Sequence, residues 1–243
     1  MEIQGAKILV TGAARRVGRA IAWRLAQAGA DLAIHYRDSK DEAAALNDRI
    51  TAAGRRSCLI RGDLADRNGP QQIIAATADA LGGLDVLVNN ASVFSAMALD
   101  QFDADAWDRT MQVNVTAVAA LCHHARPLLE STGCGSIVNL CDIAADRPWP
   151  GYLAYCVSKA GLVCLTKALA RELAPKVRVN GLSPGIAVFP EDYDVARREK
   201  LIAKVPLGRA GTPEDVAEAV QFLVSNDYIT GQIIRLDGGR SLT

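Results

Sequence analysis

Three residues of this chain have the types and the spacing for proton transfer. Tyr155 and Lys159 lie four positions apart in the run YCVSK, and Asp142 lies thirteen residues before the tyrosine. On a helix, side chains four positions apart share one face, with roughly 6 Å between their Cβ atoms. An ammonium group at that distance can stabilise a phenolate and lower the pKa of the phenol, so that the tyrosine becomes a usable acid. The pair therefore indicates an enzyme that moves a proton.

Asp142 bears on the kind of substrate. A ketone is held well by a neutral hydroxyl donor, whereas a carboxyl group can donate only when it is protonated. A carboxyl beside an acidic tyrosine suits protonation of a ring nitrogen better than polarisation of a carbonyl. The other interpretation of Asp142 is a capping residue in the loop after a strand. Its spacing from Tyr155 favours the catalytic interpretation.

These residues lie in a regular alternation of short apolar runs and helical patterns. The pattern predicts strands at 7–11, 31–36, 57–61, 84–89, 136–141, 177–182 and 233–236, and helices at 16–28, 41–53, 70–81, 105–129, 152–173 and 213–224. Such alternation predicts an α/β fold with one Rossmann-type, doubly wound parallel sheet and helices on both faces. Residues 1–243 then form a single domain. The charged, proline-containing segment 183–207 breaks the alternation and predicts a substrate loop inserted at the carboxyl edge of the sheet.

Composition argues against several classes of function. Half of the 243 residues are hydrophobic, and 27 basic residues balance 27 acidic ones. We found neither the basic excess typical of nucleic-acid binding nor an apolar run near the roughly 20 residues of a membrane span, so we expect neither partner. The six cysteines lack metal-binding spacing, so we expect no metal site. Cysteines that mostly lie in apolar surroundings, as core residues do, and an N-terminus that reads directly as structure predict a cytoplasmic protein.

The first predicted strand leads into the turn TGAARRVG and then into a helix. Such a turn directs backbone N–H groups and the helix dipole at a pyrophosphate. Gly12 permits the tight turn, and Gly18 lets the helix pack closely. On the first βα unit of a parallel sheet, this pattern predicts a dinucleotide site.

The tip of the second strand bears on the choice of cofactor. Arg37 and Ser39 suit the 2′-phosphate of NADPH, whereas the carboxylate of Asp38 would repel it unless it points to solvent. We therefore favour NADPH over NADH. Asp63, after the third strand, either accepts from the adenine amine or caps the segment that follows.

Taken together, these features resemble the short-chain dehydrogenase/reductase family over the whole chain. The motifs are the TGxxx turn, Asn89-Asn90-Ala91, Asn114, the Tyr155/Lys159 pair and Pro184-Gly185. The resemblance implies that the backbone of Asn114 holds a water in a proton relay and that Lys159 also holds the nicotinamide ribose. It further implies a homotetramer in which the two long helices pair between subunits.

Two departures from the usual family pattern resemble its pteridine reductase branch. Arg16 stands at the usual second glycine of the turn, and Asp142 stands at the usual catalytic serine. The segment NASVF that ends at Phe94, the strand end HYR and the tail DGGRSL are also similar to that branch. This resemblance implies NADPH-dependent reduction of a dihydropterin to a tetrahydropterin, or of dihydrofolate. Ala187 departs from it, because the family usually has a hydroxyl there that contacts the cofactor.

The predicted site follows from the motifs and the resemblance together. We expect Phe94 to stack on a flat pterin, although a core or loop aromatic is the other interpretation, and Arg16 to bridge the cofactor phosphate and the pterin. The predicted catalytic residues are Asp142, Tyr155, Lys159 and Asn114. The predicted substrate-binding residues are Arg16, Ser92, Phe94, Asp142 and Tyr155. The predicted cofactor-binding residues are Gly12, Arg15, Arg16, Val17, Tyr36, Arg37, Ser39, Asp63, Leu64, Asn90, Ala91, Ser92, Tyr155, Lys159, Pro184 and Gly185.

Two other functions stay open at this point. A generic carbonyl reductase of the same family, acting on 3-oxoacyl thioesters or ketones, would keep the fold, the cofactor and the Tyr155/Lys159 pair. A cofactor-binding regulator without turnover would keep only the fold and the cofactor site. Asp142, Arg16 and Phe94 argue against the first alternative, and the intact catalytic residues argue against the second.

Overall fold

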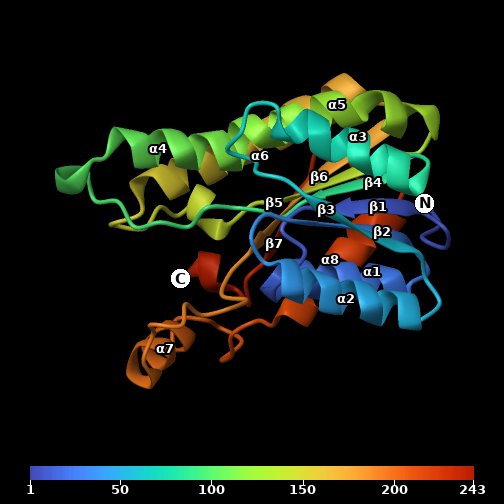
Figure 1. The fold of residues 1–243 in the computed structure, drawn as a ribbon. Helices are drawn as coiled ribbons and strands as arrows, with labels where there is room; N and C mark the ends of the chain where they lie inside the picture. The colour runs from blue at the N-terminus through green and yellow to red at the C-terminus, as the bar shows by residue number, and fades with distance from the viewer.

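Seven parallel strands form one sheet in the order β3-β2-β1-β4-β5-β6-β7 (Figure 1). This computed structural model describes residues 1–243. The strands are β1 (Lys7–Val10), β2 (Asp31–Tyr36), β3 (Ser57–Arg61), β4 (Val86–Asn89), β5 (Gly135–Leu140), β6 (Val177–Pro184) and β7 (Ile233–Leu236). The strand order reverses between β1 and β4, and ligands of such sheets bind at the carboxyl ends of the strands beside that reversal.

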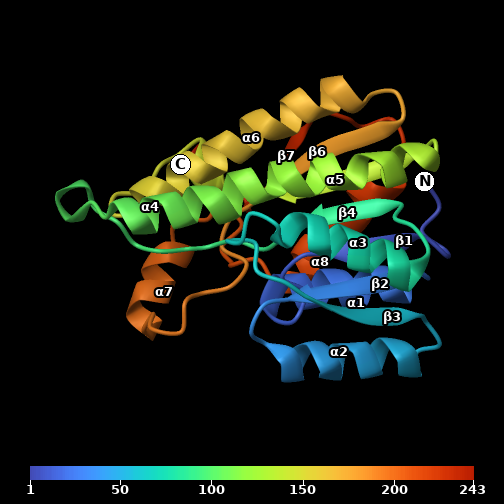
Figure 2. The same ribbon diagram turned by 45° about the horizontal axis from the view of Figure 1, so that its top comes forward.

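Helices cover both faces of the sheet, with α1, α2 and α8 on one face and α3, α5 and α6 on the other (Figure 2). The helices are α1 (Arg16–Gln27), α2 (Lys40–Ala52), α3 (Gly69–Leu81), α4 (Ala104–Met111), α5 (Ala117–Ser131), α6 (Leu153–Leu173), α7 (Val195–Ile202) and α8 (Pro213–Ser225). The predicted doubly wound α/β fold is confirmed, and the predicted element ends lie within two residues of the observed ones.

The central strands are apolar along their whole length because both of their faces are covered. Ile8 and Val10 point into a core cluster of 27 buried residues under α1, α2 and α8. Leu9, between them, points into a second cluster of 23 buried residues under α3, α5 and α6. Successive side chains of a strand alternate between faces, so one short apolar run supplies both cores.

The helix predicted at 105–129 is not a continuous α-helix. Its middle, Gln112–Thr116, winds as a π-helix between α4 and α5. Such a turn accommodates an extra residue and is frequent at functional sites. Asn114 lies inside it and uses its side chain to bind a neighbouring loop and α6, as described below.

The predicted insertion at 183–207 begins later than expected. Its first two residues belong to β6, because Ser183 and Pro184 pair with Arg235 and Leu236 of β7. The rest leaves the sheet at its carboxyl edge and carries α7, which Asp194 caps by accepting from the N–H of Arg197 at 2.7 Å. In Figure 1 this segment projects from the body of the molecule.

Helix α6 is long and apolar enough to cross a membrane, although we predicted no such segment from the sequence. The 21 residues of α6 include a window of mean hydropathy 1.4, enough to cross a membrane by these criteria alone. In this fold α6 is a core helix. It packs on the sheet through Leu162, Ala170 and Leu173, and it buries Lys159.

Candidate active site

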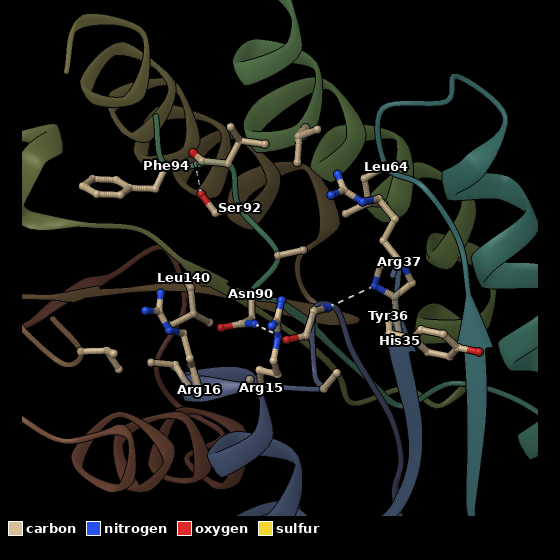
Figure 3. A pocket seen from close by; sticks show the side chains of 18 of the residues that line it. Arg15, Arg16, His35, Tyr36, Arg37, Leu64, Asn90, Ser92, Phe94 and Leu140 are labelled. Carbon is tan, nitrogen blue, oxygen red and sulfur yellow. Dashed lines mark hydrogen bonds between the residues drawn. The ribbon is translucent and has the colours of Figure 1, made fainter. Parts of the chain in front are cut away.

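A cavity of about 660 Å³ opens at the carboxyl ends of the strands, beside the reversal of strand order. Every residue that we predicted to bind cofactor or substrate lines it. Figure 3 labels eight of them, namely Arg15, Arg16, Tyr36, Arg37, Leu64, Asn90, Ser92 and Phe94. Of the predicted site residues only Asn114 does not reach the cavity wall. The sequence analysis missed several other lining residues, among them His35, Val113, Leu140 and Cys141.

The turn after β1 depends on close backbone contacts. Gly12 has φ of 61°, in the left-handed region that favours glycine. A Cβ on Gly18 would lie 2.2 Å from the Gly12 carbonyl oxygen and 2.5 Å from Nδ2 of Asn90. Both glycines therefore have the roles that the motif predicts. Arg16 also has a positive φ, of 51°, which explains why glycine would suit its position and why an arginine there is strained.

His35 supports this turn from beneath. Its Nδ1 accepts from the N–H of Gly12 at 3.1 Å, so the ring proton is on Nε2, which lies 3.3 Å from the carbonyl oxygen of Gly62 (Figure 3). Burial lowers the pKa of His35 to about 4, which keeps the ring neutral and Nδ1 free to accept. A histidine in an otherwise apolar strand was the sequence signal for this role.

Asn90 and Thr11 join the turn to the loop after β4. Nδ2 of Asn90 donates to the carbonyl oxygens of Thr11 at 2.8 Å and Gly12 at 3.1 Å. Oγ1 of Thr11 accepts from the N–H groups of Asn90 at 2.9 Å and Ala91 at 3.0 Å. Because the amide donors of Asn90 are used within the protein, this residue first of all holds the turn in shape.

Three arginines stand around the open space above the turn (Figure 3). Each of them lies within 4.0 Å of an acidic side chain. The pairs are Arg15–Glu42 at 3.7 Å, Arg16–Glu191 at 4.0 Å and Arg37–Asp38 at 2.6 Å. Exposed pairs of this kind are weak, so an anionic ligand can exchange with the acids. Glu191 comes from the segment after β6, so Arg16 lies beside the predicted substrate loop.

Two other predicted cofactor residues, Tyr36 and Asp63, have side chains that the protein itself engages. Tyr36 is buried and its ring points away from the cavity, which leaves only its backbone at the wall (Figure 3). Oδ1 of Asp63 accepts from the N–H of Ala65 at 2.9 Å. The capping alternative for Asp63 is thus confirmed, and its second oxygen faces no partner in the structure.

Asp142, Tyr155 and Lys159 lie together at the cavity wall. The hydroxyl of Tyr155 donates to Oδ2 of Asp142 at 2.7 Å, while Oδ1 accepts from the N–H of Ala144 at 2.8 Å. Asp142 is therefore both a cap of the short turn after β5 and the partner of the tyrosine, so its two predicted roles hold together. Nζ of Lys159 donates to the carbonyl oxygen of Leu140 at 2.8 Å.

The acidities of these groups differ from the expectation. The pKa of Tyr155 lies well above its ordinary value because of burial and then because of the charge and the hydrogen bond of Asp142. Burial and Asp142 thus leave the phenol weakly acidic in this structure, and the lowering of its pKa by Lys159 stays a prediction. Nζ lies 5.6 Å from the centre of the tyrosine ring, and its charge acts on Asp142.

Burial also shifts the two charged members of the cluster toward neutrality. It raises the pKa of Asp142, against the opposing effects of its hydrogen bonds to Ala144 and Tyr155 and of the Lys159 charge. It lowers the pKa of Lys159. A carboxyl with a raised pKa keeps its proton to higher pH than an ordinary aspartate, so Asp142 and Tyr155 together can hold a transferable proton.

An aromatic cluster extends from the tyrosine toward the mouth of the cavity. Phe94 stacks on Tyr152, with 4.8 Å between ring centres and 15° between planes, and meets Tyr155 edge-on at 4.8 Å. Trp149 packs nearly parallel to Tyr155 at 6.2 Å. Phe94 remains 45% exposed, which leaves ring surface open for a flat ligand. The sequence analysis missed Trp149 and Tyr152, although both lie within six residues of Tyr155.

The loop that carries Phe94 is held on both sides. Asn114 accepts from the N–H of Val93 at 2.8 Å and donates to its carbonyl oxygen and to Oγ of Ser158, both at 3.0 Å. Ser92 also donates to Asn114, at 3.2 Å, which turns its hydroxyl toward the protein. Met97 bridges to the start of α6, since its N–H donates to Gly151 at 2.7 Å. The side chain of Asn114 thus positions this loop.

Comparisons with known proteins agree on the family and diverge on the activity. Residues 12–241 match the family described as enoyl-(acyl carrier protein) reductase. A 3-oxoacyl-(acyl-carrier-protein) reductase FabG of Staphylococcus aureus is 36% identical over 236 residues, covering 95% of this chain and 96% of that protein.

Solved structures with bound cofactor are equally similar. FolM alternative dihydrofolate reductase 1 from Brucella canis, complexed with NADP, has a TM-score of 0.94 and 34% identity, covering 100% of this chain and 96% of that one. A short-chain dehydrogenase from Burkholderia cenocepacia, in complex with NADP, has a TM-score of 0.92 and 38% identity, covering 99% of each chain. With matches of this extent, the chain belongs to the short-chain dehydrogenase/reductase family.

Proposed function

We propose that this protein is an NADPH-dependent reductase that converts a dihydropterin to a tetrahydropterin, with dihydrofolate as a further substrate of the same class. The observation that carries the proposal is the bond between Tyr155 and Asp142. A buried carboxyl with a raised pKa, bonded to a phenol at a cavity wall, suits the donation of a proton to a ring nitrogen.

The cavity fits a phosphorylated dinucleotide cofactor. The left-handed turn at Gly12, the close approach of α1 at Gly18 and the three arginines at the mouth supply the backbone donors and cations that such a ligand needs. Family members of known structure hold NADP at high structural similarity, which supports the same cofactor here. When bound, the reduced nicotinamide supplies the hydride that a ring carbon of the substrate accepts.

The residues of the chain donate the proton and orient the substrate. Tyr155 donates its hydroxyl proton to the ring nitrogen next to the reduced carbon. A protonated Asp142 then gives its proton to the phenolate oxygen, which reverses the direction of the hydrogen bond that Tyr155 donates to Oδ2 in the structure, and Asp142 takes a new proton from solvent. Lys159, with one donor held by Leu140, has further N–H groups for the cofactor ribose and the proton path. Phe94 offers its open ring surface to the pterin.

The second candidate is reduction of a 3-oxoacyl thioester. The sequence relative from Staphylococcus aureus favours it, since its identity to this chain is as high as that of the dihydrofolate reductase structures. The site favours the pterin, because a ketone needs neither a carboxyl at the tyrosine nor an aromatic slot. A homotetramer and a cytoplasmic location belong to the same proposal, by analogy with the family.

The test is oxidation of NADPH by the purified protein, with dihydrobiopterin, dihydromonapterin and dihydrofolate offered beside an acetoacetyl thioester. Tyr155→Phe and Asp142→Ser serve as the matched variants. We expect turnover of a dihydropterin that both substitutions abolish. Turnover of the thioester alone, retained in Asp142→Ser, would replace the proposal by the second candidate. Cofactor binding without turnover of any of these compounds would favour a regulator.

A further inference from the structure

Aromatic residues continue outward from the cavity onto the segment after β6. Phe94, at the cavity wall, stacks on Tyr152 with 4.8 Å between ring centres. Tyr152 in turn forms a hydrogen bond with Tyr193, and this bond, together with burial, raises the pKa of Tyr152. Tyr193 lies two residues before α7 begins. A row of three rings, Phe94, Tyr152 and Tyr193, therefore leads from the place proposed for the pterin to the start of α7.

An arginine covers the outer end of this aromatic row. The guanidinium carbon of Arg197 lies 3.6 Å from the centre of the Tyr193 ring, a cation–π contact that orients an otherwise exposed side chain. None of the ion pairs of the structure includes Arg197. Because the stacking uses the face of the guanidinium, the N–H donors at its edge can bind a carboxylate.

The acidic residues near Arg197 do not cancel its charge. The acidic N-cap of α7 accepts from the backbone N–H of Arg197 at 2.7 Å, and Glu191 lies 4.0 Å from Arg16. Asp192 and Arg197 act on the pKa of Tyr152 in opposite directions, and the lowering by Arg197 is the larger effect. The outer end of the aromatic row therefore favours an anion.

We infer that Tyr193 and Arg197 form a subsite for the substituent of the pterin, which selects an aromatic substituent that ends in a carboxylate. The ring of Tyr193 packs against the aromatic part, and Arg197 binds the carboxylate. Dihydrofolate carries such a substituent, p-aminobenzoyl-glutamate, whereas dihydrobiopterin and dihydromonapterin carry short neutral hydroxyalkyl chains. This inference rests on the proposed function and ranks dihydrofolate above those two substrates by KM.

The test compares KM for dihydrofolate with KM for dihydrobiopterin, measured by NADPH oxidation at saturating NADPH. Arg197→Gln removes the charge from an exposed position. An exposed ion pair is worth up to about fivefold in binding, so KM for dihydrofolate should rise by about fivefold while KM for dihydrobiopterin stays within about twofold. Salt screens such a pair, so raising the ionic strength from ~0.05 to ~0.3 M should increase the ratio of the two KM values in the wild type and not in the variant.

Lys200→Gln is the matched control, because it removes the same charge from the last turn of the same helix. It should leave the ratio of the two KM values within about twofold of the wild type. A wild-type ratio in Arg197→Gln, or an equal shift in Lys200→Gln, would overturn this inference while the turnover of dihydropterins keeps the proposed function in place. A wild type that reduces neither substrate would overturn the proposed function and this inference with it.

Discussion

The turn after β1 and the cluster around Asp142 lie at the same edge of the sheet but are held in different ways. The turn is held through its main chain: Gly12 and Gly18 approach closely, and the side chains of His35 and Asn90 form hydrogen bonds to main-chain atoms. The cluster is fixed by side chains, through the bond from Tyr155 to Asp142 and the stacked aromatic rings.

This difference explains why the comparisons agree on the family and disagree on the activity. A site made of backbone geometry persists wherever the fold persists, whereas a site made of a few side chains changes with single substitutions. A 3-oxoacyl-(acyl-carrier-protein) reductase at 36% identity and a dihydrofolate reductase structure at 34% therefore cover this chain equally well. Substitutions in the two regions should accordingly have effects of different kinds.

The largest effect on activity should come from Asp142→Asn, which keeps the shape of the side chain and removes its acidity. If Asp142 supplies the proton, turnover should fall by about 10²- to 10⁴-fold. Because burial raises the pKa of Asp142, the wild-type rate should fall as the pH rises through that raised value. A steady-state pH profile would show this limb in the wild type and not in the variant.

A stability measurement separates this catalytic role from a structural one. A carboxyl whose pKa is higher in the folded than in the unfolded protein stabilises the fold below its unfolded pKa, and that contribution is lost as the pH rises. Asp142→Asn should therefore unfold at no lower urea concentration than the wild type at neutral pH. A marked loss of stability there, in parallel with the loss of turnover, would contradict the catalytic role.

On the backbone side, Gly18→Ala should have the largest effect. The new Cβ would lie 2.2 Å from the Gly12 carbonyl oxygen, which already accepts a hydrogen bond from Asn90. We expect a loss on the order of 4 kcal/mol in the free energy of unfolding, together with loss of cofactor binding. Gly161→Ala is the control, since the new Cβ on α6 would make an ordinary 3.4 Å contact with Cγ2 of Val115 in the π-helical turn. It should be neutral or stabilising in the same urea titration.

The backbone region was also the more predictable from sequence. The positions of strands and glycines can be predicted from local sequence. A short apolar run between helical patterns indicates a strand covered on both faces, and a glycine can mark a turn or a close contact. The positive φ of Arg16 follows from the same motif, since the position usually belongs to glycine. The π-turn around Asn114 could not be foreseen, because it depends on bonds to Val93 and Ser158, which are distant in sequence.

For the cluster around Asp142, the sequence predicts several of the residues but not their pKa values. The spacing of Asp142 and Tyr155 correctly predicts that the two side chains meet. The neighbouring sequence does not indicate how deeply each side chain is buried. That burial raises the pKa of Tyr155 despite the nearby Lys159. Trp149 and Tyr152 were missed because their position depends on the bridge between Met97 and the start of α6.

His35 offers a way to titrate the backbone region. Its pKa of about 4 in the folded protein lies below the ordinary 6.5, so the unfolded chain binds more protons between these values. Stability should therefore fall as the pH drops from 6.5 toward 4, by about 3 kcal/mol in all. His35→Asn, whose Oδ1 can replace Nδ1 as the acceptor for Gly12, should lose most of this dependence in urea titrations over that range. An equal slope in both proteins would assign the acid sensitivity to other groups.

The smallest of these effects should come from Phe94, which lies in the side-chain region but on its open edge. Stacking of one aromatic ring on a flat ligand contributes about 1 kcal/mol, so Phe94→Ala should raise KM for a dihydropterin by about fivefold. Because Asn114 and Met97 hold this loop through its backbone, the turnover number should change little. Phe94→Leu, which restores apolar bulk without a ring, should recover only part of the loss if stacking matters. Full recovery by leucine would reduce Phe94 to a hydrophobic contact, and a fall in turnover number with unchanged KM would show that its ring supports Tyr155 instead.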